Sequence, residues 1–596
     1  MKKSSRTPKD NQIAQLENEV TRLNKKITKY EALELKQNRY GLVWLDVPEA
    51  FENDVENKLP ILDEVPELAI KSNDGKPTHL LIEGDNYHAL TCLNYTHKGK
   101  VDVIYIDPPY NTGSDGFKYK DKRFLKEYPD GTPVPVDHPL RHSYWLSFMR
   151  KRLELAKDIL KDDGVIFISI DDSEFAQLKL LSDEIFNEKN LIGIFTWIRK
   201  KKGSNLSKEF RKITEYVLAY RGGNKQVVLF GQAAYAKKEV PLLNRANNVS
   251  IIHFPANKIK VGKGFNNILV KKGAFGSGEL QVELLDDIKI KDGYILNDFR
   301  LKGRFRWAQK TIDEELENGS IFTASNTFRI NIARYNQADK FKSPSSLLSP
   351  DDGIGTNEDA TEELRALFPY LDKLIFDYPK PVSLIKYLIS SIVKNKKEAK
   401  IIDFFAGSGT TGQAVMELND EDKGGRQFIL ITDNNEVTNG QRHKIMTDIC
   451  YPRIKKVING YNSKKGLGNS VRYFKTAFVG KNNILKADDA DKIELAHNAG
   501  GMLAIAENTF DQFEKTDFWQ IFENEKQFTA IYFREEFTKF DDFVERVEKL
   551  KKPVVVYIFS WEKELEFTDF DDNKNIKVKT IPQPILEIYK EIYNLI

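Results

Sequence analysis

The sequence has only two cysteines, Cys92 and Cys450, among its 596 residues. Two thiols are too few for a disulfide framework or a zinc cluster. The chain also lacks any apolar stretch of about 18 residues, and any N-terminal apolar segment that would direct export. These absences exclude a disulfide-rich secreted fold and a membrane-spanning protein. They predict a reduced, cytoplasmic protein of about three or four domains.

The net charge is small as well, at +3, although the charges are unevenly placed. Residues 199–310 contain 24 lysines and arginines against 9 aspartates and glutamates, whereas residues 481–596 contain 16 against 24. A basic surface attracts nucleic-acid phosphates and an acidic surface repels them. The basic part is therefore expected to bind nucleic acid, with an ordinary solvated face as the alternative. Its candidate contacts are Lys200, Lys201, Lys202 and Arg211.

An apolar run over residues 101–106 ends abruptly in Asp107-Pro108-Pro109-Tyr110. Such a run predicts a buried α/β strand, which stops here because proline has no N–H for the sheet. Ligands of parallel sheets bind beyond the carboxyl ends of the strands. At that place a carboxylate and free carbonyls can accept hydrogen bonds, and a tyrosine ring offers a stacking face. These groups suit a planar base with an exocyclic amine; the alternative is an ordinary Pro-Pro turn.

A second motif lies at residues 401–412, where a short apolar strand runs into a glycine-rich turn and then a helix. Glycines such as Gly407 and Gly409 let the backbone approach a ligand closely, and the helix N-terminus behind them favours polar or anionic groups. About twenty residues further on, a predicted strand is followed by Asp433 and Glu436, where a ribose diol is usually held. This part of the chain is therefore expected to bind an adenosine-like cofactor.

Together these segments resemble the amino-methylating DNA methyltransferases, in which an Asp-Pro-Pro-Tyr and a Phe-x-Gly-x-Gly motif occur in either order. Here the catalytic motif comes first and a long insertion follows, as in the β class of adenine-N6 enzymes. Longer matches at residues 82–86, 107–113 and 378–385 make the chain similar to the modification (Mod) subunit of a type III restriction-modification system. The resemblance covers residues 79–221 and 376–475 well.

The expected fold class is α/β, with a doubly wound, mostly parallel, Rossmann-like methyltransferase core. Alternating strands and helices favour this class, and the resemblance adds an inserted target-recognition domain and a small C-terminal α/β domain. The expected parts are an N-terminal helical segment with a short heptad pattern (1–45), the catalytic half of the core (46–224), the inserted domain (225–375), the cofactor-binding half (376–474) and an acidic interaction domain (475–596).

The resemblance makes Asp107, Pro108, Pro109 and Tyr110 the catalytic residues. The lone pair of adenine N6 is delocalised into the ring, so its hydrogens must be held by acceptors such as Asp107 and the Pro108 carbonyl. A fixed carboxylate also stabilises the positive charge that develops on the attacking nitrogen, and it can take the surplus proton. Tyr110 would stack on the base after it swings out of the duplex. The methyl donor is already electrophilic, so placement and desolvation suffice and no metal ion is expected.

The implied cofactor is S-adenosyl-L-methionine. Its predicted contacts are Asp85, Asp107, Lys380, Asp403, Phe404, Phe405, Gly407, Gly409, Thr410 and Glu436. Asp433 is an alternative to Glu436 for the ribose hydroxyls. Asp85 equally suits a helix cap, and both roles can hold together. Lys380 precedes a proline that starts a predicted helix, which is also a routine place for a basic residue.

The inserted domain carries Arg304 and Arg306 in a stretch that resembles type III subunits, where they could read guanine or contact phosphate. The neighbouring Trp307 is more often a core residue. The acidic C-terminal domain is expected to contact protein and not DNA. The implied partners are duplex DNA, a second copy of the chain and a separate restriction (helicase/nuclease) subunit. That subunit would drive translocation, because this chain has no Gly-x-x-x-x-Gly-Lys-Ser/Thr loop.

The predicted function is site-specific methylation of a flipped-out adenine at N6, as the modification and recognition subunit of a type III system. One alternative is cytosine-N4 methylation, although that family usually has serine at the position of Asp107. The other is a DNA-recognition subunit with vestigial methylation that positions a nuclease partner. The intact Asp107, Tyr110 and Gly407 argue against this second alternative.

Overall fold

The computed structural model divides the chain into two compact units. The first comprises residues 1–227, 346–389 and 395–596, and the second comprises residues 228–345 and 390–394. The structure describes residues 44, 59–72, 74–111, 140–201, 210–231, 239–262, 268–334, 341–369, 379–434, 436–438, 441–479, 500–532, 537–558, 570 and 573–581. The predicted heptad pattern of the N-terminal segment lies outside these residues.

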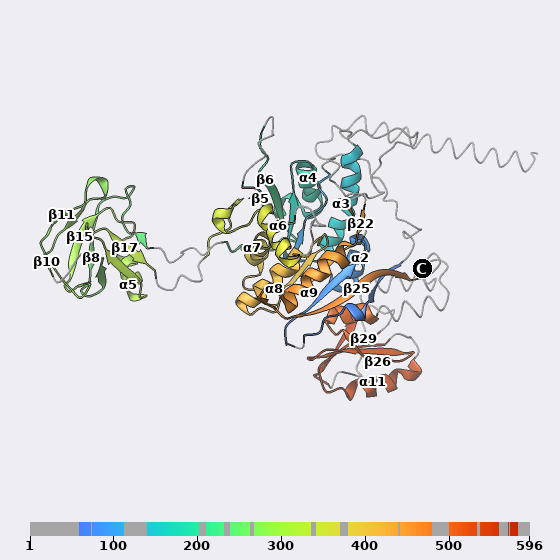
Figure 1. Cartoon of the computed structure of the whole chain (residues 1–596). Coiled ribbons are helices and arrows are strands. Elements are labelled where there is room, and N and C mark those ends of the chain that lie inside the picture. The colour runs from blue at the N-terminus through green and yellow to red at the C-terminus, as the bar shows by residue number, and fades with distance from the viewer. Residues whose placement is uncertain are drawn as a thin grey trace, which may run out of the picture. The chain divides into compact units, whose positions relative to one another are not determined.

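A sheet of ten strands forms the centre of the first unit (Figure 1). Its order is β1-β25-β2-β20-β19-β3-β4-β6-β5-β18. The strands are β1 (Leu59–Glu64), β2 (Thr78–Glu83), β3 (Val101–Ile106), β4 (Leu160–Ile170), β5 (Leu191–Ile198), β6 (Thr214–Arg221), β18 (Leu347–Leu348), β19 (Lys400–Asp403), β20 (Gln427–Thr432) and β25 (Ser470–Val479). The neighbours from β25 to β4 all pair in parallel, whereas β6 is antiparallel to both β4 and β5. The predicted mostly parallel α/β fold is therefore confirmed.

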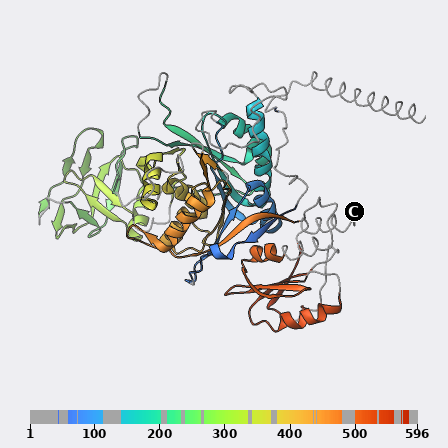
Figure 2. The same ribbon diagram turned by 45° about the vertical axis from the view of Figure 1, so that its right-hand side comes forward.

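Helices cover both faces of this sheet (Figures 1 and 2). They are α2 (Asn86–His97), α3 (Leu140–Ile159) and α4 (Phe175–Phe186) on one face, and α7 (Val382–Val393), α8 (Thr410–Asp422) and α9 (Tyr451–Asn459) on the other. On the first face, Ile104 and Ile106 of β3 share a core with Trp145 of α3. On the second, a side chain at Gly412 of α8 would collide with Ile454 of α9. Burial on both sides explains why all six residues of β3 are buried and why the run is apolar except for Asp102, which pairs with Lys161 at 2.8 Å.

The two sequence motifs meet at one edge of the sheet. Ile402 of β19 pairs with Ile104 of β3, and the strands run in the same direction, so both end at the same edge. β3 ends directly before Asp107, and β19 ends at Asp403, directly before the glycine-rich turn. Neighbouring strands lie about 4.8 Å apart. Parallel pairing therefore brings together two motifs that are far apart in the sequence.

The second unit is a β structure with one helix. One sheet has seven strands in the order β10-β13-β14-β9-β16-β17-β7, and the other has four in the order β11-β12-β15-β8. The strands are β7 (Val240–Pro241), β8 (Ser250–Phe254), β9 (Ile259–Val261), β10 (Leu269–Val270), β11 (Gly273–Phe275), β12 (Val282–Leu284), β13 (Ile288–Lys291), β14 (Tyr294–Ile295), β15 (Phe299–Gly303), β16 (Ile321–Ala324) and β17 (Ile330–Ala333), and the helix is α5 (Gln309–Glu317). Both sheets and α5 contribute to a single core of apolar side chains.

The second unit is shorter than the predicted insertion of residues 225–375. Residues 346–369 belong to the first unit instead. There β18 pairs with β5 at the edge of the main sheet, and α6 (Asn357–Leu367) begins with a capping box between Thr356 and Asp359. Two residues of strand are too few to leave a periodic pattern in the sequence, so the return of the chain to the core could not be located.

The C-terminal part adds a five-stranded sheet, in the order β26-β27-β28-β29-β30, to the first unit. Its elements are β26 (Asp511–Lys515), β27 (Trp519–Glu523), β28 (Phe528–Tyr532), α11 (Phe540–Glu548), β29 (Val554–Ile558) and β30 (Ile576–Thr580). Leu503 and Tyr557 belong to the same buried cluster as the main sheet, and Arg472 of β25 pairs with Asp511 at 2.6 Å. Across the described residues, no helix is both long and apolar enough to cross a membrane.

Candidate active site

The Asp-Pro-Pro-Tyr turn is fixed by hydrogen bonds from two aromatic side chains. The Trp145 indole, on α3, donates to the Pro109 carbonyl at 2.7 Å. The Tyr110 hydroxyl donates to Asp107 Oδ1 at 2.7 Å. No described residue donates to the Pro108 carbonyl. The turn therefore presents one carboxylate and one open carbonyl, side by side, at the end of β3.

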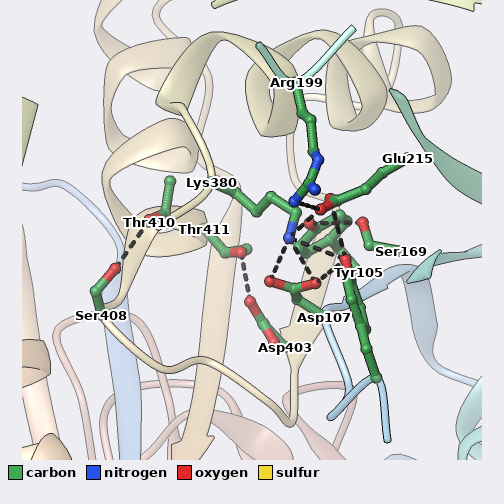
Figure 3. A network of polar contacts seen from close by, with 11 residues as sticks. Tyr105, Asp107, Ser169, Arg199, Glu215, Lys380, Asp403, Ser408, Thr410 and Thr411 are labelled. Atoms are coloured by element: carbon green, nitrogen blue, oxygen red, sulfur yellow. Dashed lines mark hydrogen bonds and ion pairs between the residues drawn. The ribbon is translucent and has the colours of Figure 1, made fainter. Parts of the chain in front are cut away.

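Lys380, which lies two residues before α7, contacts the Asp107 carboxylate at the end of β3 (Figure 3). Its Nζ lies 2.8 Å from each Asp107 oxygen, 3.0 Å from the Tyr110 hydroxyl and 3.4 Å from Glu215 Oε2. Burial alone would lower the pKa of Lys380, but the charges of Asp107 and Glu215 outweigh it and raise the pKa. Lys380 is thus a buried, charged group of the site. This position differs from the routine surface lysine that the sequence left open as an alternative.

Glu215 and Arg199 complete this network, and neither was predicted as a site residue. Glu215 is buried on β6 and accepts a hydrogen bond from Arg199 Nη1 at 2.9 Å. Arg199 had been noted only as the start of a basic run. A signal for Glu215 did exist, because a carboxylate inside an otherwise apolar strand is rarely buried without a partner. The sequence alone could not identify that partner.

The Tyr110 hydroxyl stays protonated in this setting. Burial, and next the charge of Asp107, raise the pKa of Tyr110 well above its usual value. The hydroxyl is therefore protonated near neutral pH and available as a donor. It also lies 3.3 Å from Glu215 Oε2, so its single proton can be shared between two carboxylates.

The glycine-rich turn has the backbone conformation that glycine allows. Gly407 and Gly409 have φ values of 48° and 79°. A Cβ on Gly409 would lie 3.0 Å from the Cys450 sulfur, so no other residue fits without displacement. α8 begins directly after Gly409, so its N-terminus faces the turn. The backbone is thereby open to close approach by a ligand.

Arg453 of α9 supports the turn from within the protein. It is buried, and its Nη1 donates to Ser408 Oγ at 3.0 Å and to Thr410 Oγ1 at 2.8 Å. Sequence analysis gave Arg453 no role, since nothing in the motif marks it. Because the Thr410 hydroxyl accepts from Arg453, it takes part in the hydrogen bonds that hold the turn together. The predicted contact of Thr410 with the cofactor stays a prediction.

Asp403 is buried at the end of β19 and stabilises the same turn. Its oxygens accept from the Phe405 N–H at 3.0 Å and from the Thr411 hydroxyl at 2.5 Å. Burial raises the pKa of Asp403 to about 7, despite these two hydrogen bonds, which favour the charged form. The Phe404 carbonyl accepts from Asn86 Nδ2 at 2.9 Å, so the residue after Asp403 is also fixed.

Asp85 caps α2, as the alternative reading of its position predicted. It accepts from the Tyr87 N–H at 2.8 Å and from Arg152 Nη2 at 3.3 Å. A second role at the cofactor stays a prediction. Glu436 begins the short strand β21 (Glu436–Thr438), but its side chain lies outside the described residues, and Asp433 directly follows β20. The choice between these two acids therefore stays open.

The predicted DNA contacts fall into different environments. In the first unit, Lys201 forms an ion pair with Asp359 at 2.8 Å, whereas Arg211 is exposed. Lys200 is half-buried, and Lys202 lies outside the described residues. In the second unit, Arg304 Nη1 donates to the Asn247 carbonyl at 2.7 Å, and Arg306 is exposed.

Trp307, in the second unit, packs against the apolar core, as the base rate for large aromatic residues predicted. The Arg334 guanidinium lies 4.3 Å from the centre of its ring. This aromatic side chain is therefore part of the packing of the unit and is not a free wedge.

Comparison with known proteins identifies the family. A family model described as DNA methylase matches residues 101–440, a range that begins with β3 and includes the glycine-rich turn. The Mod subunit of the type III enzyme EcoPI, from Escherichia phage P1, is 32% identical over 72% of this chain and 70% of that one. The Mod subunit of StyLTI, from Salmonella typhimurium, is 32% identical over 73% of this chain and 66% of its own length.

Among solved structures, the M1.HpyAVI–SAM complex aligns at a TM-score of 0.27 and 12% identity, over 63% of this chain and 97% of that chain. So low a score has no bearing on the fold, which follows from the strand order itself. The family match covers both segments, at the ends of β3 and β19, that form the candidate site. The chain belongs to the DNA methylase family, and the Mod subunits of type III restriction-modification enzymes are its relatives over most of its length.

Proposed function

We propose that this protein transfers a methyl group from S-adenosyl-L-methionine to N6 of adenine in duplex DNA. The observation that carries the proposal is the parallel pairing of β3 with β19, which places the Asp107 carboxylate beside the glycine-rich turn. Methyl transfer needs the amine and the donor within about 3 Å of each other at the moment of reaction. A cleft bounded by both motifs meets that need.

The residues of the cleft suit the target amine. Asp107 and the Pro108 carbonyl supply two acceptors for the two N6 hydrogens, and holding those hydrogens directs the nitrogen lone pair toward the donor. As positive charge develops on N6, the fixed carboxylate of Asp107 stabilises it without reorganisation of solvent. Tyr110 adds a ring on which a base can stack once it has left the duplex. No step requires a metal ion.

The residues around the turn also suit the cofactor. Gly407 and Gly409 adopt backbone conformations that favour glycine, and the N-terminus of α8 directly follows them. Asp85, Phe404, Phe405 and Glu436 would surround the adenosine part, with Asp433 as the alternative for the ribose. When bound, S-adenosyl-L-methionine supplies an electrophilic methyl on a sulfonium. Lys380 would hold the Asp107 carboxylate in place beside the bound cofactor.

The relatives extend the proposal to a biological role. Two of them are named as Mod subunits of type III restriction-modification enzymes, so we assign this chain the same role, with duplex DNA as substrate and a separate restriction subunit as partner. The second unit would read the target sequence. Arg211 and Arg306 are exposed and so could contact DNA, and Lys200 is partly exposed. A homodimer and a cytoplasmic location belong to the same proposal.

The test is chemical analysis of the product base. The purified chain is incubated with duplex DNA of random sequence and with S-adenosyl-L-methionine labelled in the methyl group, and the nucleosides are separated by mass spectrometry. The proposal predicts label in N6-methyladenine alone. Label in N4-methylcytosine would assign the alternative reaction, and DNA binding without any labelled base would reduce the chain to a recognition subunit.

A further inference from the structure

One face of the second unit carries a polar row that crosses five neighbouring strands. Lys291 of β13 pairs with Tyr294 of β14, which pairs with Lys260 of β9; Lys260 pairs with Thr323 of β16, which pairs with Asn331 of β17. Paired residues of adjacent strands point to the same side of a sheet. These five side chains therefore lie in one line on one face of the seven-stranded sheet.

That face is turned away from the core. The residues that alternate with the row are buried, namely Ile288, Ile290, Ile259, Phe322, Ile330 and Ile332. Lys289, two residues before Lys291, is exposed on the same side as the row. We call the set Lys260, Lys289, Lys291, Tyr294, Thr323 and Asn331 the lysine face.

The lysines are not the only charged groups at this face, because the Glu239 carboxylate accepts hydrogen bonds from Thr323 and Asn331. None of Lys260, Lys289 and Lys291 forms an ion pair with any residue that the structure describes. The four-stranded sheet of the same unit differs in this respect. There Arg300 pairs with Asp286 at 2.8 Å and Lys302 with Glu283 at 2.9 Å. The two sheets thus bear similar numbers of cations, but only the lysine face leaves its cations available.

The other groups of the row suit a polar and partly aromatic ligand. Lys260 Nζ lies 5.8 Å from the centre of the Tyr294 ring, which keeps the ring in place beside a cation. Thr323 and Asn331 both contact Glu239, at 3.3 and 3.4 Å, so their hydroxyl and amide groups are oriented. A row of five strands spans about 19 Å, given a spacing of about 4.8 Å. Within the row the two cations, Lys291 and Lys260, are two strands apart, which is about 10 Å.

We infer that the lysine face binds the sugar-phosphate backbone of duplex DNA. The inference rests on the proposed function, because a unit that reads the target must first be held on the duplex. Unpaired lysines supply the attraction, since they release counterions from the phosphates when they bind. The four-stranded sheet is a poor alternative, because Arg300 and Lys302 are paired with carboxylates and the neighbouring α5 carries Asp313, Glu314, Glu315 and Glu317.

The experiment compares two variants of the full chain, one in each sheet of the second unit. The first, Lys260→Ala/Lys289→Ala/Lys291→Ala, removes the three unpaired lysines. The second, Arg300→Ala/Lys302→Ala, removes two paired cations from the other sheet of the same unit. The dissociation constant for a fluorescent duplex is measured by anisotropy between 50 and 300 mM salt (about the range in which phosphate contacts are resolved). Thermal unfolding shows whether each variant retains its fold.

Each phosphate contact contributes about 0.9 to the slope of log affinity against log salt. The lysine-face variant should therefore lose about 2 to 3 from that slope, and its affinity at low salt should fall at least about tenfold. The paired-cation variant should keep the slope within about 0.5 of the parent value. An unchanged slope in the lysine-face variant, or an equal loss in both, would overturn the inference.

The same experiment separates this inference from the proposed function. Binding to the duplex is read without methyl transfer, so a parent chain that binds DNA but methylates no base would contradict the proposed function and leave the slope comparison intact. Conversely, a chain that methylates adenine while the lysine-face variant binds with the parent slope would leave the reaction in place and remove the lysine face. In that case an acidic protein surface would be the better match for these cations.

Discussion

The Lys380 ammonium lies 2.8 Å from both carboxylate oxygens of Asp107, although the two residues are 273 positions apart in the sequence. Lys380 lies two residues before α7, and Asp107 directly follows β3. The carboxylate that should meet the target amine is therefore held by a cation from the other half of the core. Glu215, 3.4 Å from the same ammonium, balances the charge of the group together with Arg199. This arrangement leads to the first two predictions.

Removal of Lys380 should destabilise the protein. In Lys380→Met, Asp107 loses its cationic partner, and Glu215 is left with Arg199 alone. Loss of one partner of a buried ion pair costs about 3 kcal/mol of unfolding free energy. The double variant Lys380→Met/Glu215→Gln removes one of the two like charges and should recover part of that loss. Denaturant unfolding of both variants checks this, and strictly additive losses would contradict it.

Glu215→Gln should affect catalysis more than binding. The substitution keeps the shape of the side chain but removes one of the two charges that raise the pKa of Lys380. The single-turnover rate should fall at alkaline pH as Lys380 loses its proton. In Glu215→Gln this fall should therefore begin at a lower pH than in the parent. Near neutral pH we expect a loss of about tenfold in rate, with the KM for S-adenosyl-L-methionine unchanged.

The matched control for this prediction is Glu417→Gln. Glu417 also faces a lysine, Lys386, at 3.2 Å, but it lies on α8 and outside the network of Asp107. The single-turnover rate of Glu417→Gln, and the pH at which this rate falls in alkaline solution, should equal those of the parent. If the alkaline fall in rate shifts as far in pH in the control as in Glu215→Gln, the effect is not specific to Glu215.

Two substitutions of Tyr110 separate its ring from its hydroxyl. Tyr110→Phe keeps the stacking face but loses the hydrogen bond to Asp107, so the rate should fall about tenfold. Tyr110→Ala also loses the stacking, which is worth about 1–3 kcal/mol per base. Fluorescence of a 2-aminopurine placed at the target adenine should rise on binding for the parent and for Tyr110→Phe, and much less for Tyr110→Ala. A full rise in Tyr110→Ala would remove the capture role of the ring.

Asp403 should make the stability of the protein depend on pH. Burial raises its pKa from 3.8 to about 7, so the folded state binds this proton more tightly than the unfolded state does. The resulting stability is fully present below the unfolded pKa and is lost as pH rises toward about 7. Relative to Asp403→Asn, the parent should therefore lose about 2 kcal/mol of unfolding free energy between pH 5 and 7.

Asp422→Asn serves as the comparison for Asp403. The pKa of Asp422 is lowered to about 2: its partial burial is outweighed by hydrogen bonds and charges from Arg426 and Lys397. It is ionised in both states between pH 5 and 7, so its substitution should shift the parent curve by a constant amount. If the unfolding free energies of the parent and Asp403→Asn also differ by a constant amount between pH 5 and 7, the buried proton of Asp403 does not contribute to the pH dependence of stability.

The core of the site could be predicted from the sequence because each motif follows an apolar strand. The apolar run before Asp107 and the one before the glycine-rich turn each predict a buried parallel strand. Proline ends the first strand and glycine follows the end of the second. The fold class follows from the same alternation. The cap formed by Asp85 was also open to prediction, since aspartate is a frequent first residue of a helix.

The parts that escaped prediction depend on pairing between distant segments. Glu215 and Arg453 belong to no motif, and only the order of strands and the packing of α9 bring them to the site. The return of the chain to the first unit after residue 345 rests on β18, a strand of two residues. The lysine face is a row across five strands, whose register no local pattern encodes.

The most direct test of the account is the single-turnover rate of methyl transfer by Asp107→Ala. The affinities of this variant for S-adenosyl-L-methionine and for duplex DNA are measured by calorimetry and anisotropy in the same samples. We predict affinities within about threefold of the parent and a rate that is lower by about 100-fold or more. A variant that binds both ligands and still forms N6-methyladenine at the parent rate would contradict the role of Asp107 and, with it, the whole account of the site.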